Sequence, residues 1–277
     1  MAKFPLITIL FAAVVALTGC NGGAARTEDS VKTGTTAADR LQEKVLTFWD
    51  NGAPKGLPED SLEQRVADYL FLLENTVDPV ATDPYKAASA REALKRMAVQ
   101  VGGNEFVTET IVDYLGNPDS PMGNKSLLRL AVEELLRAGK TTPEMRARLE
   151  DLNGELAKNV YGSRIADIPL TMEDGSTTTL LKFAGAAPQT LLIIYDPDCE
   201  RCKAAIDYHA EVMTGYQGAP AVLMLSTTGE HIADLPAGWK RVTTPEEELD
   251  EKFYMPALPQ IFLLDPQGKI LYYPWEY

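Results

Sequence analysis

The stretch Thr190-Leu-Leu-Ile-Ile-Tyr-Asp-Pro-Asp-Cys199-Glu-Arg-Cys202-Lys-Ala-Ala-Ile206 decides how the C-terminal half of the chain folds. Residues 191–195 form a continuous apolar run, which predicts a strand buried on both faces. Asp196-Pro197-Asp198 ends that strand, and a segment of helical character begins at the two cysteines. A C-x-x-C at the start of a helix is typical of a redox site. The partial positive charge of a helix N-terminus favours a thiolate at Cys199.

Two other interpretations of Cys199 and Cys202 compete with redox chemistry. A zinc site needs about four ligands, and the chain has no second cysteine pair and only two histidines, so we expect no metal. A purely structural disulfide stays open. It would close a very short loop and would therefore constrain little of the unfolded chain. The redox interpretation is favoured for that reason.

The third cysteine, Cys20, lies at the end of a targeting sequence. Lys3 supplies a positive start, and the apolar residues 6–17 are too few for a comfortable membrane span. Leu17-Thr18-Gly19-Cys20 resembles the lipobox of bacterial lipoproteins. The resemblance implies removal of residues 1–19 and lipid, such as palmitate, on Cys20. An ordinary secretory signal is the alternative. Residues 20–38 are small and polar, which indicates a flexible tether to the membrane.

Residues 39–160 predict an all-helical domain of about six helices, because apolar residues recur at helical spacing. One predicted stripe contains Leu41, Val45 and Trp49. Expected N-caps are Asn104, Asn124 and Thr142, the last followed by a proline. The aromatic residues of this part, Phe71 among them, are expected mostly in the core. Nothing in these residues has the pattern of a catalytic site.

In residues 161–277 the spacing of apolar residues changes from that of helices to that of strands. We expect a hairpin of residues 168–172 and 177–181 around Glu173-Asp174-Gly175. After the cysteine helix come a strand at 219–226, a short strand at 239–242 and a capped helix opened by Thr244-Pro245-Glu246. Two final strands flank the turn Asp265-Pro266-Gln267-Gly268.

This second part resembles the thioredoxin-like thiol–disulfide oxidoreductases of the TlpA and ResA type. The resemblance rests on the hairpin, the strand leading to Cys199-x-x-Cys202, and Leu258-Pro259 before a strand. It implies that Cys199 attacks, that Cys202 resolves, and that the Leu258–Pro259 bond is cis in a substrate groove. The chain departs from the family pattern at Asp198, where tryptophan is common.

The charges around Cys199 predict a reductant more than an oxidant. Arg201 and Lys203 favour the thiolate, whereas Asp196, Asp198 and Glu200 oppose it. We regard Asp198, Glu200 and Arg201 as the residues that tune the redox pair. A poorly stabilised thiolate leaves the disulfide comparatively favoured, which is the property of a reducing pair.

Composition narrows the choice of partners. The net charge of −14 argues against binding to nucleic acid. We expect exported proteins with disulfides as substrates, a redox partner or electron donor at the membrane, and no cofactor. The expected location is the cell envelope, with the protein anchored by lipid and facing the periplasm. The alternative is an envelope binding protein whose helical domain docks a partner while the disulfide is structural.

Overall fold

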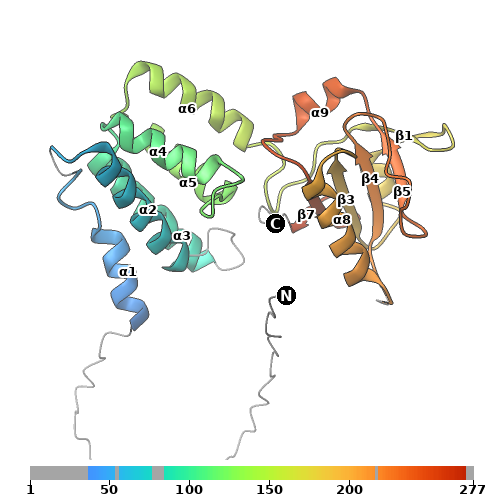
Figure 1. Ribbon diagram of the computed structural model, residues 1–277, viewed down its shortest axis with the longest axis horizontal. Coiled ribbons are helices and arrows are strands. Elements are labelled where there is room, and N and C mark those ends of the chain that lie inside the picture. The colour runs from blue at the N-terminus through green and yellow to red at the C-terminus, as the bar shows by residue number, and fades with distance from the viewer. Residues whose placement is uncertain (1–36, 54–55, 77–83, 216–217, 273–277) are drawn as a thin grey trace, which may run out of the picture. The chain divides into compact units, whose positions relative to one another are not determined.

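The computed structural model describes residues 37–53, 56–76, 84–215 and 218–272. Within these residues, the N-terminal part consists of helices that pack around their own apolar core (Figure 1). The helices are α1 (Ala37–Thr47), α2 (Glu59–Thr76), α3 (Pro84–Val101), α4 (Glu105–Gly116), α5 (Lys125–Ala138) and α6 (Pro143–Leu156).

The helix boundaries follow the capping residues of the sequence. The side chains of Asn104, Asn124 and Thr142 accept hydrogen bonds from the backbone of the first turns of α4, α5 and α6. Each bond satisfies one of the backbone N–H groups that a helix start leaves without a partner. Gly139 ends α5 in the left-handed conformation, with φ of 63°. The three predicted N-caps are confirmed.

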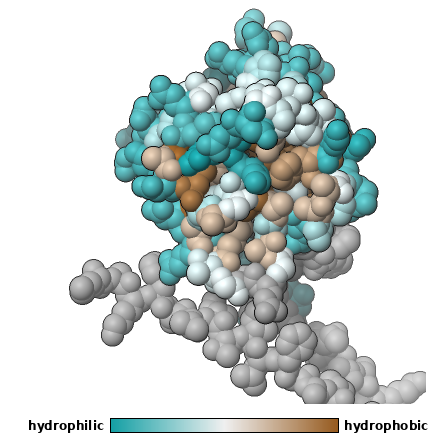
Figure 2. Space-filling model, turned by 90° about the vertical axis from the view of Figure 1, so that its right-hand side faces the viewer, coloured by the Kyte–Doolittle hydropathy of each residue, from teal (hydrophilic) through white to brown (hydrophobic). Residues whose placement is uncertain are grey.

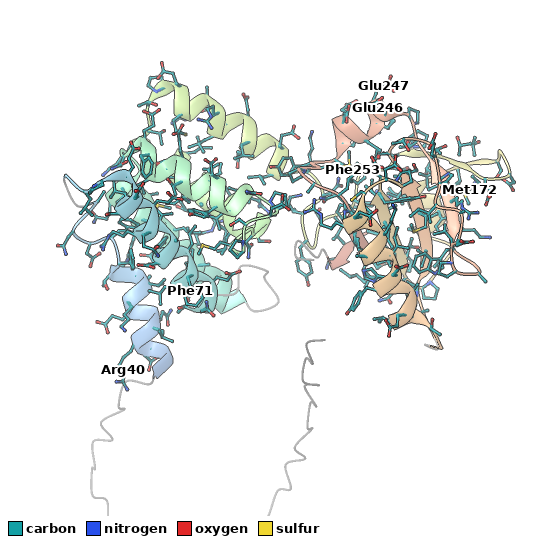
Figure 3. The ribbon with its side chains drawn as sticks, viewed as in Figure 1. Arg40, Phe71, Met172, Glu246, Glu247 and Phe253 are labelled. Carbon is teal, nitrogen blue, oxygen red and sulfur yellow. The ribbon has the colours of Figure 1, made fainter. Side chains whose placement is uncertain are left out.

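The predicted apolar stripe of the first helix is wrong in part. Helix α1 ends at Thr47, so Trp49 lies in the following turn, where it is buried against Phe48 and Tyr69. Leu41 is 41% exposed. Phe71 on α2 is also not a core residue, since 62% of it is exposed (Figure 3). Helical periodicity selects a face, but the packing of neighbouring helices decides how far along the helix that face is covered.

Among the described residues, the C-terminal part is built on a seven-stranded mixed sheet, with strand order β2-β1-β5-β4-β3-β6-β7. The centre is parallel: β3 pairs with β4, and β4 pairs with β5. The outer pairings, of β1 with β2 and β5 and of β6 with β3 and β7, are antiparallel. The strands are β1 (Pro169–Met172), β2 (Thr177–Thr179), β3 (Thr190–Tyr195), β4 (Ala221–Ser226), β5 (Lys240–Thr243), β6 (Gln260–Leu264) and β7 (Ile270–Tyr272).

Strand β3 is central and buried on both faces, as its apolar run predicts. Leu192 and Ile194 enter the core on one face of the sheet, and Ile193 and Tyr195 enter the core on the other. Helix α8 (Glu200–Met213) packs on the second face through Cys202, Ala205 and Ile206. The strand therefore fixes the position at which the cysteine helix begins.

Two predictions for this part need correction. The second hairpin strand stops at Thr179, two residues before the predicted end at Leu181. The Thr179 hydroxyl caps the short helix α7 (Leu180–Ala184), so residues 180 and 181 are helical. Helix α9 (Glu246–Lys252) begins after Pro245 without a side-chain cap, and the Thr244 hydroxyl donates to the carbonyl of Pro169 instead. Glu246 and Glu247 lie at the start of α9, where the helix dipole favours negative charge (Figure 3).

All described residues belong to one compact unit. Asn159, which follows α6, is part of the junction between the helices and the sheet. Its amide nitrogen donates to the Lys252 carbonyl and its amide oxygen accepts from the Ala166 backbone, both at 2.8 Å. Its φ of 49° is positive, a conformation that asparagine tolerates better than most residues. These bonds tie the connection after α6 to the end of α9.

Candidate active site

Cys199 is the N-cap residue of α8. Its Sγ accepts a hydrogen bond from the backbone nitrogen of Cys202 at 3.2 Å. The turn before it is held by Asp196, whose carbonyl accepts from the Cys199 nitrogen at 3.2 Å and whose carboxylate accepts from the Asp198 nitrogen at 2.7 Å. The sulfur therefore lies at the positive end of the helix dipole, which stabilises a thiolate. The residue is partly exposed, so a substrate can reach it.

Cys202 lies one turn further along and is fully buried. Burial, followed by the hydrogen bond with Cys199, raises the pKa of the Cys202 thiol to about 12. Cys202 therefore remains protonated at neutral pH while the pair is reduced. The two cysteines have the unequal environments that thiol–disulfide exchange uses, with one accessible sulfur and one sheltered sulfur.

The loop before β6 closes the site from the other side. The Leu258–Pro259 peptide bond is cis, as the resemblance implies. The carbonyl oxygen of Leu258 accepts from the Cys199 thiol, with 3.9 Å between sulfur and oxygen. Leu258 itself packs against the cores on both faces of the sheet. The loop and the first cysteine are thus in contact although they are far apart in the sequence.

Arg201 reaches the same carbonyl oxygen. Its Nε donates to Leu258 O at 2.9 Å, so the guanidinium group lies beside the loop that contacts Cys199. Lys203, by contrast, pairs with Glu200 at 2.8 Å, and this pairing raises the pKa of the lysine. Asp198 and Glu200 are both exposed, and solvent weakens the effect of their charges on the sulfur. Of the three residues expected to tune the pair, Arg201 has the most direct contact with the loop.

Comparison with known proteins bears on the fold. No protein-family model and no curated protein matches the sequence. Among solved structures, a thioredoxin-like protein of Bacteroides caccae superimposes with a TM-score of 0.73 at 20% identity, over 87% of this chain and 91% of the other.

The chain has a thioredoxin-like fold. Residues 161–277 make up less than half of the sequence, so a match over 87% of it also includes helices that precede the thioredoxin-like domain.

Other structures match a smaller share of the chain. The thioredoxin domain of a thiol-disulfide oxidoreductase of Bacteroides vulgatus is 20% identical, covers 41% of this chain and 87% of its own, and has a TM-score of 0.34. A thiol:disulfide interchange protein of a Bacteroides species is 18% identical, covers 41% of this chain and 80% of its own, also with a TM-score of 0.34. At this level of similarity, the fold assignment rests on the first structure.

The sequence did not indicate one residue near the thioredoxin-like cysteines. Asp119, in the connection between α4 and α5, forms an ion pair with Arg201, with 2.7 Å between Oδ1 and Nη1. It is an acidic residue in a polar turn, between Pro118 and Ser120, and no local pattern sets it apart. Only the packing of the helices against the thioredoxin-like domain brings it to the site.

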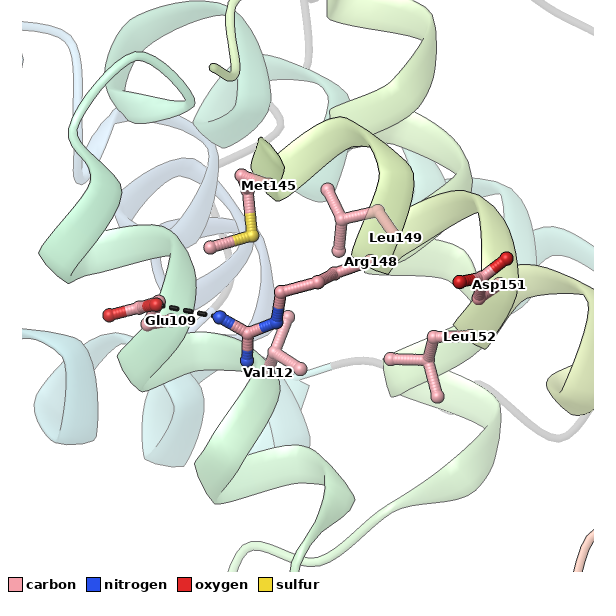
Figure 4. Close-up of a pocket in the computed structure, with 7 residues that line it drawn as sticks. All are labelled: Glu109, Val112, Met145, Arg148, Leu149, Asp151 and Leu152. Carbon is pink, nitrogen blue, oxygen red and sulfur yellow. Dashed lines mark hydrogen bonds and ion pairs between the residues drawn. The ribbon is translucent and has the colours of Figure 1, made fainter. Parts of the chain in front are cut away.

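Two features of the surface lie outside this site. Glu109, Val112, Met145, Arg148, Leu149, Asp151 and Leu152 line a hollow of about 310 Å³ beside α4 and α6 (Figure 4). On the face that lies to the right in Figure 1, hydrophobic residues gather near the centre, with hydrophilic residues between them (Figure 2). Such patches are common where one protein contacts another.

The predicted lipidation site lies outside the described residues. Cys20, the signal sequence and almost all of the tether precede residue 37. Among the helices that the structure describes, none is both long and apolar enough to cross a membrane.

Proposed function

We propose that this protein is a membrane-anchored thiol–disulfide oxidoreductase that reduces disulfides of exported proteins. The observation that carries the proposal is the inequality of its two cysteines. The sulfur of Cys199 is accessible at a helix N-terminus, whereas the sulfur of Cys202 is buried and protonated. A structural disulfide needs no such difference. An exchange reaction does, because one sulfur attacks the substrate first and the other must stay protonated until the mixed disulfide has formed.

The reaction consists of two exchanges of sulfur partners. The Cys199 thiolate attacks one sulfur of a substrate disulfide, a mixed disulfide forms, and the other substrate sulfur leaves as a thiolate that takes up a proton. Cys202 then loses its proton and attacks the Cys199 sulfur. The second substrate sulfur leaves and is protonated, and a Cys199–Cys202 disulfide remains. Two electrons and two protons have passed to the substrate, and a dithiol redox partner at the membrane restores the reduced pair.

The direction of electron flow follows from the charges around Cys199. Asp196, Asp198 and Glu200 lie close to it in the sequence and oppose the thiolate. Their charges destabilise the thiolate form of the reduced pair relative to the disulfide, which favours a reducing pair.

The place of action rests on the N-terminal sequence. Cys20 in its lipobox-like context supports a lipid anchor, and the polar residues after it support a tether that holds the folded part off the bilayer. We propose a location in the cell envelope on the periplasmic side.

The test is a redox titration of a fragment that begins at Asn21. The fragment is equilibrated in dithiothreitol or glutathione buffers of known potential, and its free thiols are counted by the mass added on alkylation. A reversible two-electron transition is expected, with a midpoint in the range of reductants. In Cys202→Ser the mixed disulfide with a substrate protein should accumulate, since no second thiol can release it. In Cys199→Ser no mixed disulfide should form.

The second candidate function is a binding protein whose helical domain docks a partner. The hollow beside α4 and α6 (Figure 4) and the exposed Phe71 favour it. A disulfide that resists reduction until the protein unfolds, with no mixed disulfide in Cys202→Ser, would support this function and contradict the oxidoreductase.

A further inference from the structure

The ion pair between Asp119 and Arg201 connects the two parts of the molecule. Asp119 lies between helices α4 and α5, 82 residues before Arg201 on the cysteine helix. The carboxylate is 78% exposed and the guanidinium group 37% exposed. Exposed ion pairs add little to stability, so this pair contributes little to holding the two parts together.

Arg201 is held by a second bond that points toward the reacting sulfur. Its Nε donates to the carbonyl oxygen of Leu258 at 2.9 Å, and the thiol of Cys199 donates to that same oxygen. Asp119 therefore contacts a group that shares a hydrogen-bond acceptor with the attacking cysteine. The carboxylate does not touch the sulfur, so any effect that it has must pass through Arg201 or through its own charge.

We propose that Asp119 of the helical domain is a positioning residue that sets the reactivity of Cys199 through Arg201. The inference deepens the proposed function, on which it rests. Asp119 pairs with Nη1 of Arg201 and neutralises part of the guanidinium charge. The positive charge that favours a thiolate at Cys199 is therefore smaller. The helical domain thereby keeps the pair reducing.

Removal of the carboxylate should have the opposite effect. In Asp119→Asn the Leu258 bond still holds the guanidinium group near the site, but its charge is no longer compensated. A thiolate at Cys199 is then favoured by about two- to fivefold, the range of one exposed ion pair. A more stable thiolate makes the reduced form of the pair more stable, so the midpoint potential should rise. A tenfold change in the equilibrium constant corresponds to about 30 mV for two electrons, so the expected rise is about 10 to 20 mV.

The experiment measures how the alkylation rate of Cys199 depends on pH in the full-length reduced protein. Iodoacetamide is the probe, and the peptide that contains Cys199 is quantified by mass spectrometry, so Cys20 does not interfere. We expect the pH of the half-maximal rate to fall by roughly half a unit in Asp119→Asn. It should stay at the wild-type value in Asp119→Glu, which keeps the charge.

Two further variants isolate the route. Glu150→Gln breaks an exposed ion pair with Arg146, at 2.9 Å, elsewhere in the helical domain, and should leave the profile unchanged. In an Arg201→Gln background, Asp119→Asn should have almost no effect, because a double-mutant cycle exposes the coupling of contacting groups.

An unchanged profile in Asp119→Asn would overturn the inference. So would an equal shift with and without Arg201, since the carboxylate would then act directly. The proposed function fails on a different result, the lack of a reversible redox transition in the wild-type protein, so the two failures can be told apart.

Discussion

The Sγ of Cys199 and the backbone nitrogen of Cys202 lie 3.2 Å apart, so the first cysteine caps the helix that contains the second. A sulfur in this position receives a backbone N–H bond and the helix dipole, both of which favour negative charge. Cys202 is enclosed by the apolar core of α8 and the sheet, and this burial is the largest cause of its raised pKa. One short motif thus places two thiols in different environments.

The first prediction is that alkylation distinguishes these two thiols. Burial raises the pKa of Cys202 to about 12, so almost no Cys202 thiolate exists at pH 8, and the side chain is out of reach of the reagent. A reduced fragment beginning at Asn21 should gain one iodoacetamide adduct when folded and two in 8 M urea, a denaturant concentration of roughly the size needed to unfold domains. Peptide mass spectrometry should place the first adduct on Cys199. Modification of both cysteines at equal rates in the folded protein would contradict this assignment.

The second prediction concerns a buried lysine. The Lys125 side chain is enclosed between Lys158 O, at 3.3 Å, and the Tyr254 ring, at 5.4 Å. Burial, and then repulsion by Arg129, lower the pKa of Lys125 to about 8. Between pH 8 and about pH 10.5, Lys125 binds more protons in the unfolded chain than in the folded protein. The free energy of unfolding should therefore rise with pH over this range, by on the order of 3 kcal/mol.

The matched variant for this effect is Lys125→Met, which keeps the length of the side chain and cannot ionise. The measurement is urea unfolding of both proteins at several pH values. The difference in unfolding free energy between wild type and variant should be constant below pH 8 and should shift in favour of wild type above it. Other titrating groups, such as Tyr69, are common to both proteins and cancel. A difference that does not change with pH would show that Lys125 has an ordinary pKa.

The third prediction compares two glycines in turns. Gly268 and Gly175 have nearly equal positive φ values, 77° and 80°. A Cβ at Gly268 would collide with the Leu181 side chain, whereas a Cβ at Gly175 has open space. Gly175→Ala should cost about 1 kcal/mol of backbone strain. Gly268→Ala should cost about 1–3 kcal/mol more, because packed side chains must move. Equal losses in thermal or urea unfolding would mean that Leu181 moves aside freely.

The fourth prediction tests the lipid anchor. Cys20→Ser removes the only sulfur of the lipobox-like sequence. Cells fed with labelled palmitate should incorporate the label into the wild-type protein and not into the variant, and the variant should leave the membrane fraction. Cys199→Ser is the matched control, since it removes a cysteine from the folded part and should keep the label. Label in both serine variants would contradict acylation at Cys20.

The sequence alone determined the local structure with few errors. An apolar run bounded by Asp196-Pro197-Asp198 is a buried strand for the same reason in any fold, and Asn104, Asn124 and Thr142 cap helices through bonds to residues three positions away. These features depend on neighbours in the chain, so a pattern of residues records them. One error arose where two local preferences competed, at Thr179, which suits a strand but caps α7.

Tertiary structure alone decided which distant residues meet. Nothing near Asp119 in the sequence indicates a partner on the cysteine helix, and nothing near Lys125 indicates that its amine lies over the Tyr254 ring. Such contacts depend on how the helices pack against the thioredoxin-like domain, and that packing is the sum of many weak apolar contacts between surfaces. The sequence therefore determined which charges flank the two cysteines along the chain, and the packing of the helices against the thioredoxin-like domain brought Asp119 to Arg201.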